Sequence, residues 1–75
     1  MRKLPTLKQL QHLVALFDYQ HFGKAADACF ISQSTMSASI VQLEETLGIQ
    51  LLEREHKTFI FTSLAEDIVE KSRSL

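Results

Sequence analysis

The chain has 75 residues, 45% hydrophobic and 23% charged, which suits one small domain and leaves little room for an enclosed active-site cavity. Eight Lys and Arg nearly balance nine Asp and Glu, so the whole-chain charge attracts neither nucleic acid nor an anionic membrane, and any such attraction must be local. The single cysteine excludes an intramolecular disulfide, and no apolar run approaches the roughly 20 residues of a membrane span.

The amino-terminal stretch begins with basic residues but is not typical of a signal peptide. Its later part is interrupted by Lys8, Gln9, Gln11 and His12, and it lacks a small-residue cleavage site. We therefore expect a cytoplasmic protein.

The first third of the chain predicts two helices. Thr6 can cap a first helix after Pro5. Apolar residues then recur at three- and four-residue steps, at Leu7, Leu10, Leu13, Val14 and Phe17. A second, short helix restarts at Gly23. Its small side chains, which allow another helix to cross closely, are Ala25, Ala26 and Ala28.

A third helix is predicted from about Gln33 to Leu47. Ser32 is a good N-cap, and Gly48 stands where a left-handed C-terminal cap is expected. One apolar stripe runs along this helix, formed by Met36, Ile40, Leu43 and Leu47. The stripe is expected to face the core.

The segment after the third helix predicts a hairpin. Phe59 and Phe61 fall on one face and Thr58, Ile60 and Thr62 on the other, an alternation that is typical of a strand. The turn is expected around Glu55, His56 and Lys57, and the two phenylalanines are expected to be core beneath the hairpin.

A final helix is expected to open at Ser63. Ser63 and Glu66 fit a capping box, S-x-x-E. The residues that share one side of this helix are Leu64, Ile68 and Leu75. Because this stripe is unfinished where the sequence stops, we expect the front of a longer protein, cut within a linker helix.

Two short helices around a tight turn, followed by a hairpin, predict a winged helix-turn-helix. The expected fold is mainly α, with a DNA-binding domain over residues 1–62 and a linker helix starting at 63–75. In this motif the second helix lies in the major groove, so its first turns must be small and polar. The residues that qualify are Gln33, Ser34, Thr35, Ser37 and Gln42. Because most solvated helix faces are polar, this feature alone is weak evidence.

A longer match makes the interpretation specific. The stretch "HFGKAADACFISQSTMSASIVQLEETLGIQLLER" resembles the N-terminal domain of LysR-type transcriptional regulators, whose pattern is F-x-x-A-A-x-x-x-x-V/I-S-Q-P/S-x-L/M-S-x-x-I-x-x-L-E-x-x-L-G-x-x-L-L/F-x-R. The matching residues, with the spacing intact, are Phe22, Ala25, Ala26, Ile31, Ser32, Gln33, Ser34, Met36, Ser37, Ile40, Leu43, Glu44, Leu47, Gly48, Leu51, Leu52 and Arg54. The run "HFGKAADACFISQ" is most similar to the peroxide-sensing OxyR branch. In this family a C-terminal domain, outside these 75 residues, binds the effector or senses oxidant.

The resemblance implies sequence-specific binding of double-stranded DNA by a dimer, on an interrupted inverted repeat. The start of the third helix would contact base edges and nearby backbone, and the wing would contact phosphate or the minor groove. The DNA-binding residues expected on this basis are Lys24, Ser32, Gln33, Ser34, Thr35, Ser37, Ala38, Gln42, Arg54 and Lys57. The expected dimer surface is the stripe Leu64, Ile68 and Leu75. No cofactor, metal or catalytic residue is implied.

Several positions depart from the family pattern. Ala38 replaces a frequent arginine, and Val41 and Gln42 stand where basic residues are common. Further replacements, which leave the spacing unchanged, are Ser34 for proline, Glu66 for glycine, and Glu55 and His56 in the wing turn. The third helix therefore carries no basic residue, and affinity for DNA must come from positive groups around it.

The expected positive groups are Arg2, Lys3, Lys24, Arg54 and Lys57. The helix N-termini near Gly23 and Ser32 would add phosphate contacts. If Lys3, Lys24, Arg54 and Lys57 each met a phosphate, a dimer would make about eight contacts and show a log-log salt slope of roughly −7.

Other interpretations remain open at this point. Cys29 sits between alanines and Phe30, which favours a core thiol over a sensor. A metal site on His12, His21 and Cys29 lacks a recognised spacing. A hydrolase built on His21, Asp27 and the serines at 32, 34, 37 and 39 lacks a nucleophile elbow and an oxyanion loop.

Three alternatives concern the DNA interpretation itself. Arg54 could pair with an acidic neighbour, Glu44, Glu53 or Glu55, and orient the wing. Lys24 could be an ordinary solvated residue at a helix start. The whole domain could instead be a winged-helix protein-interaction module that has lost DNA binding, a hypothesis favoured by Ala38, Val41 and the acidic balance.

Overall fold

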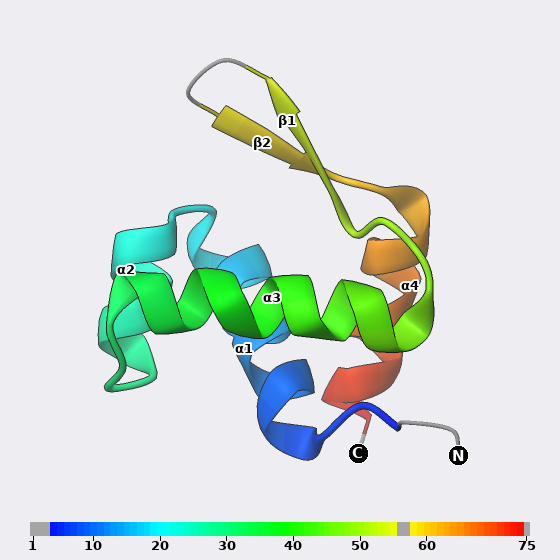
Figure 1. The fold of residues 1–75 in the computed structure, drawn as a ribbon, viewed down its shortest axis with the longest axis horizontal. Coiled ribbons are helices and arrows are strands. Elements are labelled where there is room, and N and C mark those ends of the chain that lie inside the picture. The colour runs from blue at the N-terminus through cyan, green and yellow to red at the C-terminus, as the bar shows by residue number, and fades with distance from the viewer. Residues whose placement is uncertain (1–3, 56–57, 75) are drawn as a thin grey trace.

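The computed structural model describes residues 4–55 and 58–74 and has four helices with one antiparallel hairpin. The elements, in chain order, are α1 (Leu7–Tyr19), α2 (Phe22–Ala28), α3 (Gln33–Leu47), β1 (Leu52–Glu55), β2 (Thr58–Phe61) and α4 (Ser63–Arg73). Figure 1 shows α3 crossing in front of α1, with α2 and α4 towards its two ends and the hairpin above. The predicted winged helix-turn-helix is confirmed.

The ends of α1 and α3 follow from local capping. Thr6 Oγ1 accepts the Gln9 N–H at 3.0 Å, and Gln9 Oε1 accepts the Thr6 N–H at 3.0 Å, which is a reciprocal capping box. Ser32 Oγ caps α3, and Gly48 ends it in the left-handed conformation (φ 69°). Both predicted bounds of α3 are confirmed.

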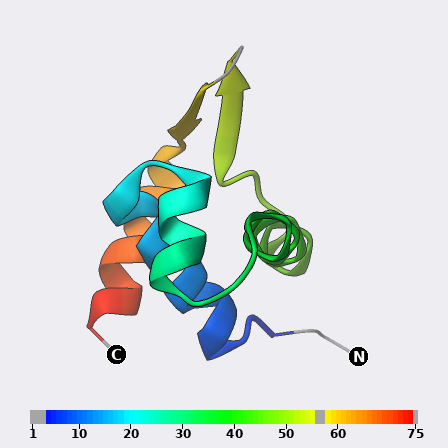
Figure 2. The ribbon, with the colours of Figure 1, turned by 90° about the vertical axis from the view of Figure 1, so that its left-hand side faces the viewer.

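The core lies where α1 packs against the other helices. Apolar side chains from every helix and from the start of the hairpin are buried there: Leu13, Leu16, Ala25, Ala26, Met36, Ile40, Leu43, Leu51, Leu52, Ala65 and Val69. Figure 2, turned by 90°, shows α3 end-on at one side of α1 and α2, with the hairpin standing above the helices. This packing leaves the outer side of α3 open to solvent.

A row of aromatic rings connects the hairpin to the helices. Phe59 lies with its ring centroid 5.2 Å from that of Phe22 in α2, and Phe61 lies 5.1 Å from Phe17 in α1. Phe59 and Phe61 also contact each other, at 5.6 Å. Such edge-to-face pairs add to burial and fix ring orientation. The expectation that both phenylalanines lie beneath the hairpin is confirmed.

The predicted start of α2 and the predicted cap of α4 are each wrong by one residue. α2 begins at Phe22 rather than Gly23, because His21 caps it. α4 is capped by Thr62, so the capping box on Ser63 and Glu66 does not form. The Thr62 N–H donates to the Leu51 carbonyl oxygen at 2.9 Å, which holds Thr62 at the hairpin base, and its hydroxyl accepts the N–H of Ala65 at 3.2 Å.

Within the described residues, no helix combines the length and the apolar character that crossing a membrane requires.

Candidate nucleic-acid interface

The outward face of α3 has small side chains in its first half and carries no basic residue. Helical periodicity puts Ser34, Ala38, Val41 and Glu45 along this face, and all four are exposed. The opposite face holds the buried side chains of the helix, Met36, Ser39, Ile40 and Leu43. Val41 is 42% exposed, so this face combines apolar groups at Ala38 and Val41 with the polar Ser34 and Glu45.

The two edges of this face meet different parts of the fold. Gln33 lines a cleft beside the hairpin together with Arg54, and Ser37 follows one turn later on the same edge. Thr35 and Gln42 instead line a groove against the amino-terminal half of α1. The structure therefore brings Gln33 and Arg54 together and places Gln42 away from them.

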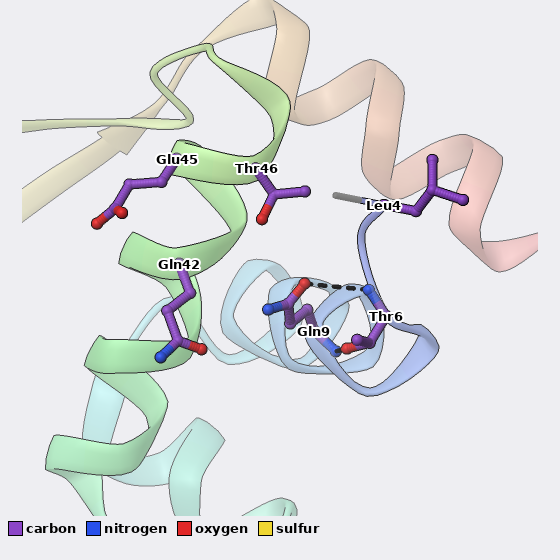
Figure 3. Close-up of a pocket in the computed structure, with 6 residues that line it drawn as sticks. All are labelled: Leu4, Thr6, Gln9, Gln42, Glu45 and Thr46. Atoms are coloured by element: carbon purple, nitrogen blue, oxygen red, sulfur yellow. Dashed lines mark hydrogen bonds between the residues drawn. The ribbon is translucent and has the colours of Figure 1, made fainter. Parts of the chain in front are cut away.

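The groove on the α1 side has an acidic end. An open space of about 760 Å³ lies between the start of the chain and the second half of α3. Figure 3 shows its lining, with Leu4, Thr6 and Gln9 on one side and Gln42, Glu45 and Thr46 on the other. Because the Glu45 carboxylate repels phosphate, this end of α3 is unsuited to the DNA backbone.

Arg54 lies against an aromatic ring rather than an acidic partner. Its guanidinium carbon is 5.4 Å from the ring centroid of Phe22, within the range of a cation–π contact. The Glu44 carboxylate instead accepts the N–H groups of Leu51, at 2.8 Å, and Leu52, at 3.3 Å. Within residues 4–55 and 58–74, no ion pair involves Arg54, so the alternative that it pairs with Glu44, Glu53 or Glu55 is wrong.

The cleft beside Arg54 joins α2, α3 and the hairpin. It measures about 270 Å³ and is lined by Gln20, His21, Phe22, Gly23, Gln33, Arg54, Thr58 and Phe59. The side chains of Arg54 and of Gln33, at the start of α3, therefore line the same cleft. The sequence pattern identified Gln33 and Arg54 but gave no signal for Phe22 as the support of the guanidinium.

The first turn of α3 holds its hydroxyl groups in a local network. Ser32 Oγ accepts the Thr35 N–H at 3.0 Å and donates to Thr35 Oγ1 at 2.8 Å. Ser34 Oγ lies 3.1 Å from Ser32 Oγ. Ser32 is therefore committed to the cap, where it fixes the helix start, while Ser34 faces outward.

Lys24 is exposed near the start of α2, beside a histidine cap. The Lys24 N–H donates to His21 Nδ1 at 3.0 Å, which takes up one of the amides expected to be free near Gly23. A side chain at Gly23 would come within 2.9 Å of a ring carbon of His21, so glycine leaves room for the cap. His21 was missed from the sequence because histidine is not among the strongly preferred caps.

The expected dimer residues differ in exposure. Leu64 keeps 53% of its side chain exposed, whereas Ile68 is half-buried and packs against the core. Leu75, like Lys57 and the basic residues Arg2 and Lys3, lies outside the described residues.

The remaining candidate residues have structural partners. Cys29 is half-buried against the core, and burial raises the pKa of its thiol. His12 Nδ1 lies 2.7 Å from Ser39 Oγ, and His21 caps α2, so the two histidines serve different contacts. Across the described ranges, no three His, Cys, Asp or Glu side chains gather as metal ligands.

Comparison with known proteins gives one family. The model of the family described as "Bacterial regulatory helix-turn-helix protein, lysR family" matches residues 7–66. The hydrogen peroxide-inducible genes activator of Pectobacterium carotovorum is 42% identical over 69 residues, which cover 92% of this chain and 23% of that protein. This chain therefore spans about a quarter of that relative.

Two solved structures match over most of the chain. The Corynebacterium glutamicum OxyR C206S mutant, bound to hydrogen peroxide, matches with a TM-score of 0.90 and 38% identity, covering 99% of this chain and 23% of that one. The BenM_DBD/benA site 1 DNA complex matches with a TM-score of 0.85 and 38% identity, covering 92% of this chain and 78% of that one.

Proposed function

This chain belongs to the LysR family of bacterial regulatory helix-turn-helix proteins, and we propose that it is the sequence-specific DNA-binding domain of a transcriptional regulator. α3 enters the major groove of double-stranded DNA, and the hairpin contacts the backbone or the minor groove. The observation that carries the proposal is the exposed start of α3, where the small or polar side chains of Gln33, Ser34 and Ala38 lie beside Arg54 in a fold that matches BenM_DBD with DNA.

The residues of α3 have distinct roles in this proposal. Gln33 can bond adenine in bidentate fashion, and the Ser34 and Ser37 hydroxyls can serve several bases. Ala38 is suited to contact a thymine methyl group, since it replaces a charged side chain with a small apolar one. Ser32 and Thr35 hold the helix start through their cap.

Positive charge comes from outside α3. Arg54, supported by Phe22, and Lys24, exposed at the start of α2, provide phosphate contacts on the hairpin side of the reading helix. Lys57 would add to them on the wing. These contacts supply affinity, and the base edges supply specificity.

We further propose that the domain acts as a homodimer. In this proposal residues 1–62 are the DNA-binding part and residues 63–75 begin a linker helix, and the exposure of Leu64 leaves it accessible to a partner. A two-fold dimer reads two half-sites about one helical turn apart, so an interrupted inverted repeat is the expected target. As a regulator of bacterial promoters the protein acts in the cytoplasm, and we assign it no catalysis.

Selection of duplexes from a random library tests the proposal. The folded domain is expected to enrich an interrupted inverted repeat. Gln33→Ala and Ser37→Ala should reduce preference at individual base pairs by about 5- to 150-fold, corresponding to roughly 1–3 kcal/mol per good contact. Glu70→Gln, on the exposed side of α4, is the control and should leave the preference unchanged.

A second function, a protein-interaction module, is favoured by one observation. Val41 and Glu45 stand on the outward face of α3, where they add an apolar and an acidic group. Folded protein that enriches no sequence at low salt, even when a coiled-coil fusion holds it as a dimer, would contradict DNA binding and favour this alternative.

A further inference from the structure

His12 and Ser39 form a polar contact inside an otherwise apolar helix interface. They are the buried polar residues of the described chain, with 7% and 8% of their surfaces exposed, and they bond to each other. His12 Nδ1 lies 2.7 Å from Ser39 Oγ, across 27 residues of sequence. The contact ties the middle of α1 to the middle of α3.

Among the residues that the structure describes, the other buried side chains of α1 and α3 form no hydrogen bond between the two helices. These other buried side chains are aliphatic or thioether groups, namely Leu13, Leu16, Met36, Ile40 and Leu43. Apolar burial is non-directional, whereas a hydrogen bond weakens steeply as it bends. The His12–Ser39 bond therefore makes the interface sensitive to the rotation of α3 about its axis.

The rotation of α3 determines which side chains reach the DNA. Ser39 follows Ala38 directly, and successive residues of a helix are about 100° apart, so fixing Ser39 fixes Ala38 on the outward face. Gln42, one turn on from Ser39, is fixed on the α1 edge in the same way.

The bond also lies beside these residues in space. His12 and Ser39 line a groove of about 390 Å³ between α1 and α3, together with Thr6, Lys8, Gln9, Thr35, Ala38 and Gln42. Burial and the nearby Lys8 ammonium lower the pKa of His12, which favours the neutral ring. A neutral imidazole can either accept the Ser39 hydroxyl proton or donate to its oxygen.

We propose that the His12–Ser39 hydrogen bond sets the rotation of α3 and makes His12 a positioning residue for base recognition. The inference rests on the proposed function and deepens it, since His12 tunes specificity without touching DNA. Without the bond, α3 settles into neighbouring rotations and presents Ser37, Ala38 and Gln42 differently. The consequence is a changed base preference, and not only weaker binding.

The test removes both partners at once. In the double variant His12→Phe/Ser39→Ala no buried polar atom is left without a partner, so the fold is expected to persist. Selection from the random library should show base preference at individual positions altered by about 2- to 10-fold relative to the unchanged chain, the range expected for coupled contacts. The single variant Ser39→Thr, which keeps His12 and the hydroxyl, should retain the base preference of the unchanged chain. Tyr19→Phe, on the exposed part of α1, is the control.

An NMR measurement on the free protein follows the helix itself. The amide shifts of Ser37, Ala38 and Gln42 should move in the double variant and return in Ser39→Thr. If the double variant does not fold, Ser39→Ala alone is measured in the same two ways, because it removes a single hydroxyl.

The outcomes separate the inference from the proposed function. Base preference that stays the same while affinity falls equally for every sequence overturns the inference, since the bond would then only stabilise the fold. If the unchanged chain enriches no sequence, the proposed function fails. In that case unmoved α3 amides in the double variant overturn the positioning role as well.

Discussion

The guanidinium of Arg54 lies over the ring of Phe22, 5.4 Å from its centroid. The contact joins the hairpin to α2 and holds a flexible cationic side chain at the cleft that Gln33 also lines. Arg54 is exposed, so it remains free to meet a phosphate group while its other face rests on the ring. Phe22 in turn packs edge-on against Phe59, which fixes the support.

Arg54→Gln is expected to weaken binding to all DNA sequences by a similar factor. The reason is that a phosphate contact carries little sequence information. The log-log salt slope should become less steep by about one unit for each protomer. Salt titrations of a fixed duplex measure this, and Lys71→Gln, which removes a charge from α4, is the matched control with an unchanged slope.

Phe22→Leu separates the charge from its support. The salt slope should change less than in Arg54→Gln, because the guanidinium is still present, but affinity should fall. If Arg54→Gln changes base preference at one position and leaves the slope alone, Arg54 reads a base edge and the phosphate role is wrong.

Thr62→Ala is expected to destabilise the fold more than Ser63→Ala. Thr62 caps α4, and its hydroxyl also donates to the Gln50 carbonyl oxygen at 2.9 Å, so the substitution removes two contacts. We expect a loss of about 1–2 kcal/mol for Thr62→Ala and less than about 0.5 kcal/mol for Ser63→Ala. Urea unfolding of the two variants measures the difference, and equal losses would mean that Ser63 shares the cap.

The local features of the fold could be predicted from the sequence. Ser32 and Gly48 set the ends of α3 through contacts within four residues, so the cap pattern was sufficient. The alternation around Phe59 and Phe61 likewise gave the buried side of the hairpin. At α4 the same reasoning failed by one residue, because Thr62 and Ser63 can both cap a helix. The bond from the Thr62 N–H to the Leu51 carbonyl oxygen, at the base of the hairpin, places Thr62 at the cap.

The contacts that complete the site join residues far apart in the sequence. Arg54 meets Phe22 across α2, α3 and β1, and His12 meets Ser39 across 27 residues. The periodicity of apolar residues along the sequence does not distinguish these partners from ordinary core or surface residues. The alternative in which Arg54 pairs with Glu44 rested on the acidic residues near it in the sequence. This pair does not form, since Glu44 binds the Leu51 and Leu52 N–H groups that follow α3.

Stability should fall as the solution is acidified, through His12. Burial, followed by the Lys8 ammonium, lowers the pKa of His12 in the folded protein below its ordinary value of 6.5. As the pH falls through 6.5, the unfolded chain binds the proton first, so it is favoured over the folded chain. The free energy of unfolding should therefore decrease between pH 6.5 and the lower folded-state pKa, with a slope of at most about 1.4 kcal/mol per pH unit.

Urea unfolding at a series of pH values from 8 to about 5 measures this effect. The His12→Phe/Ser39→Ala variant is the control, and its stability should depend less on pH over the same interval. A pH dependence that is identical in both proteins would assign the effect to other groups.

Phe30 combines two unfavourable features, and replacing it should stabilise the domain. It lies in the turn between α2 and α3 with 95% of its side chain exposed and a φ of 60°, a left-handed conformation that costs most residues about 1–2 kcal/mol. Phe30→Gly relieves that strain while making the unfolded chain more flexible, so we expect a net gain of about 0.5–1 kcal/mol in urea unfolding. Phe30→Ala keeps the Cβ atom and should leave stability nearly unchanged. Equal gains in both variants would instead show that removal of the exposed ring, and not the backbone, is responsible.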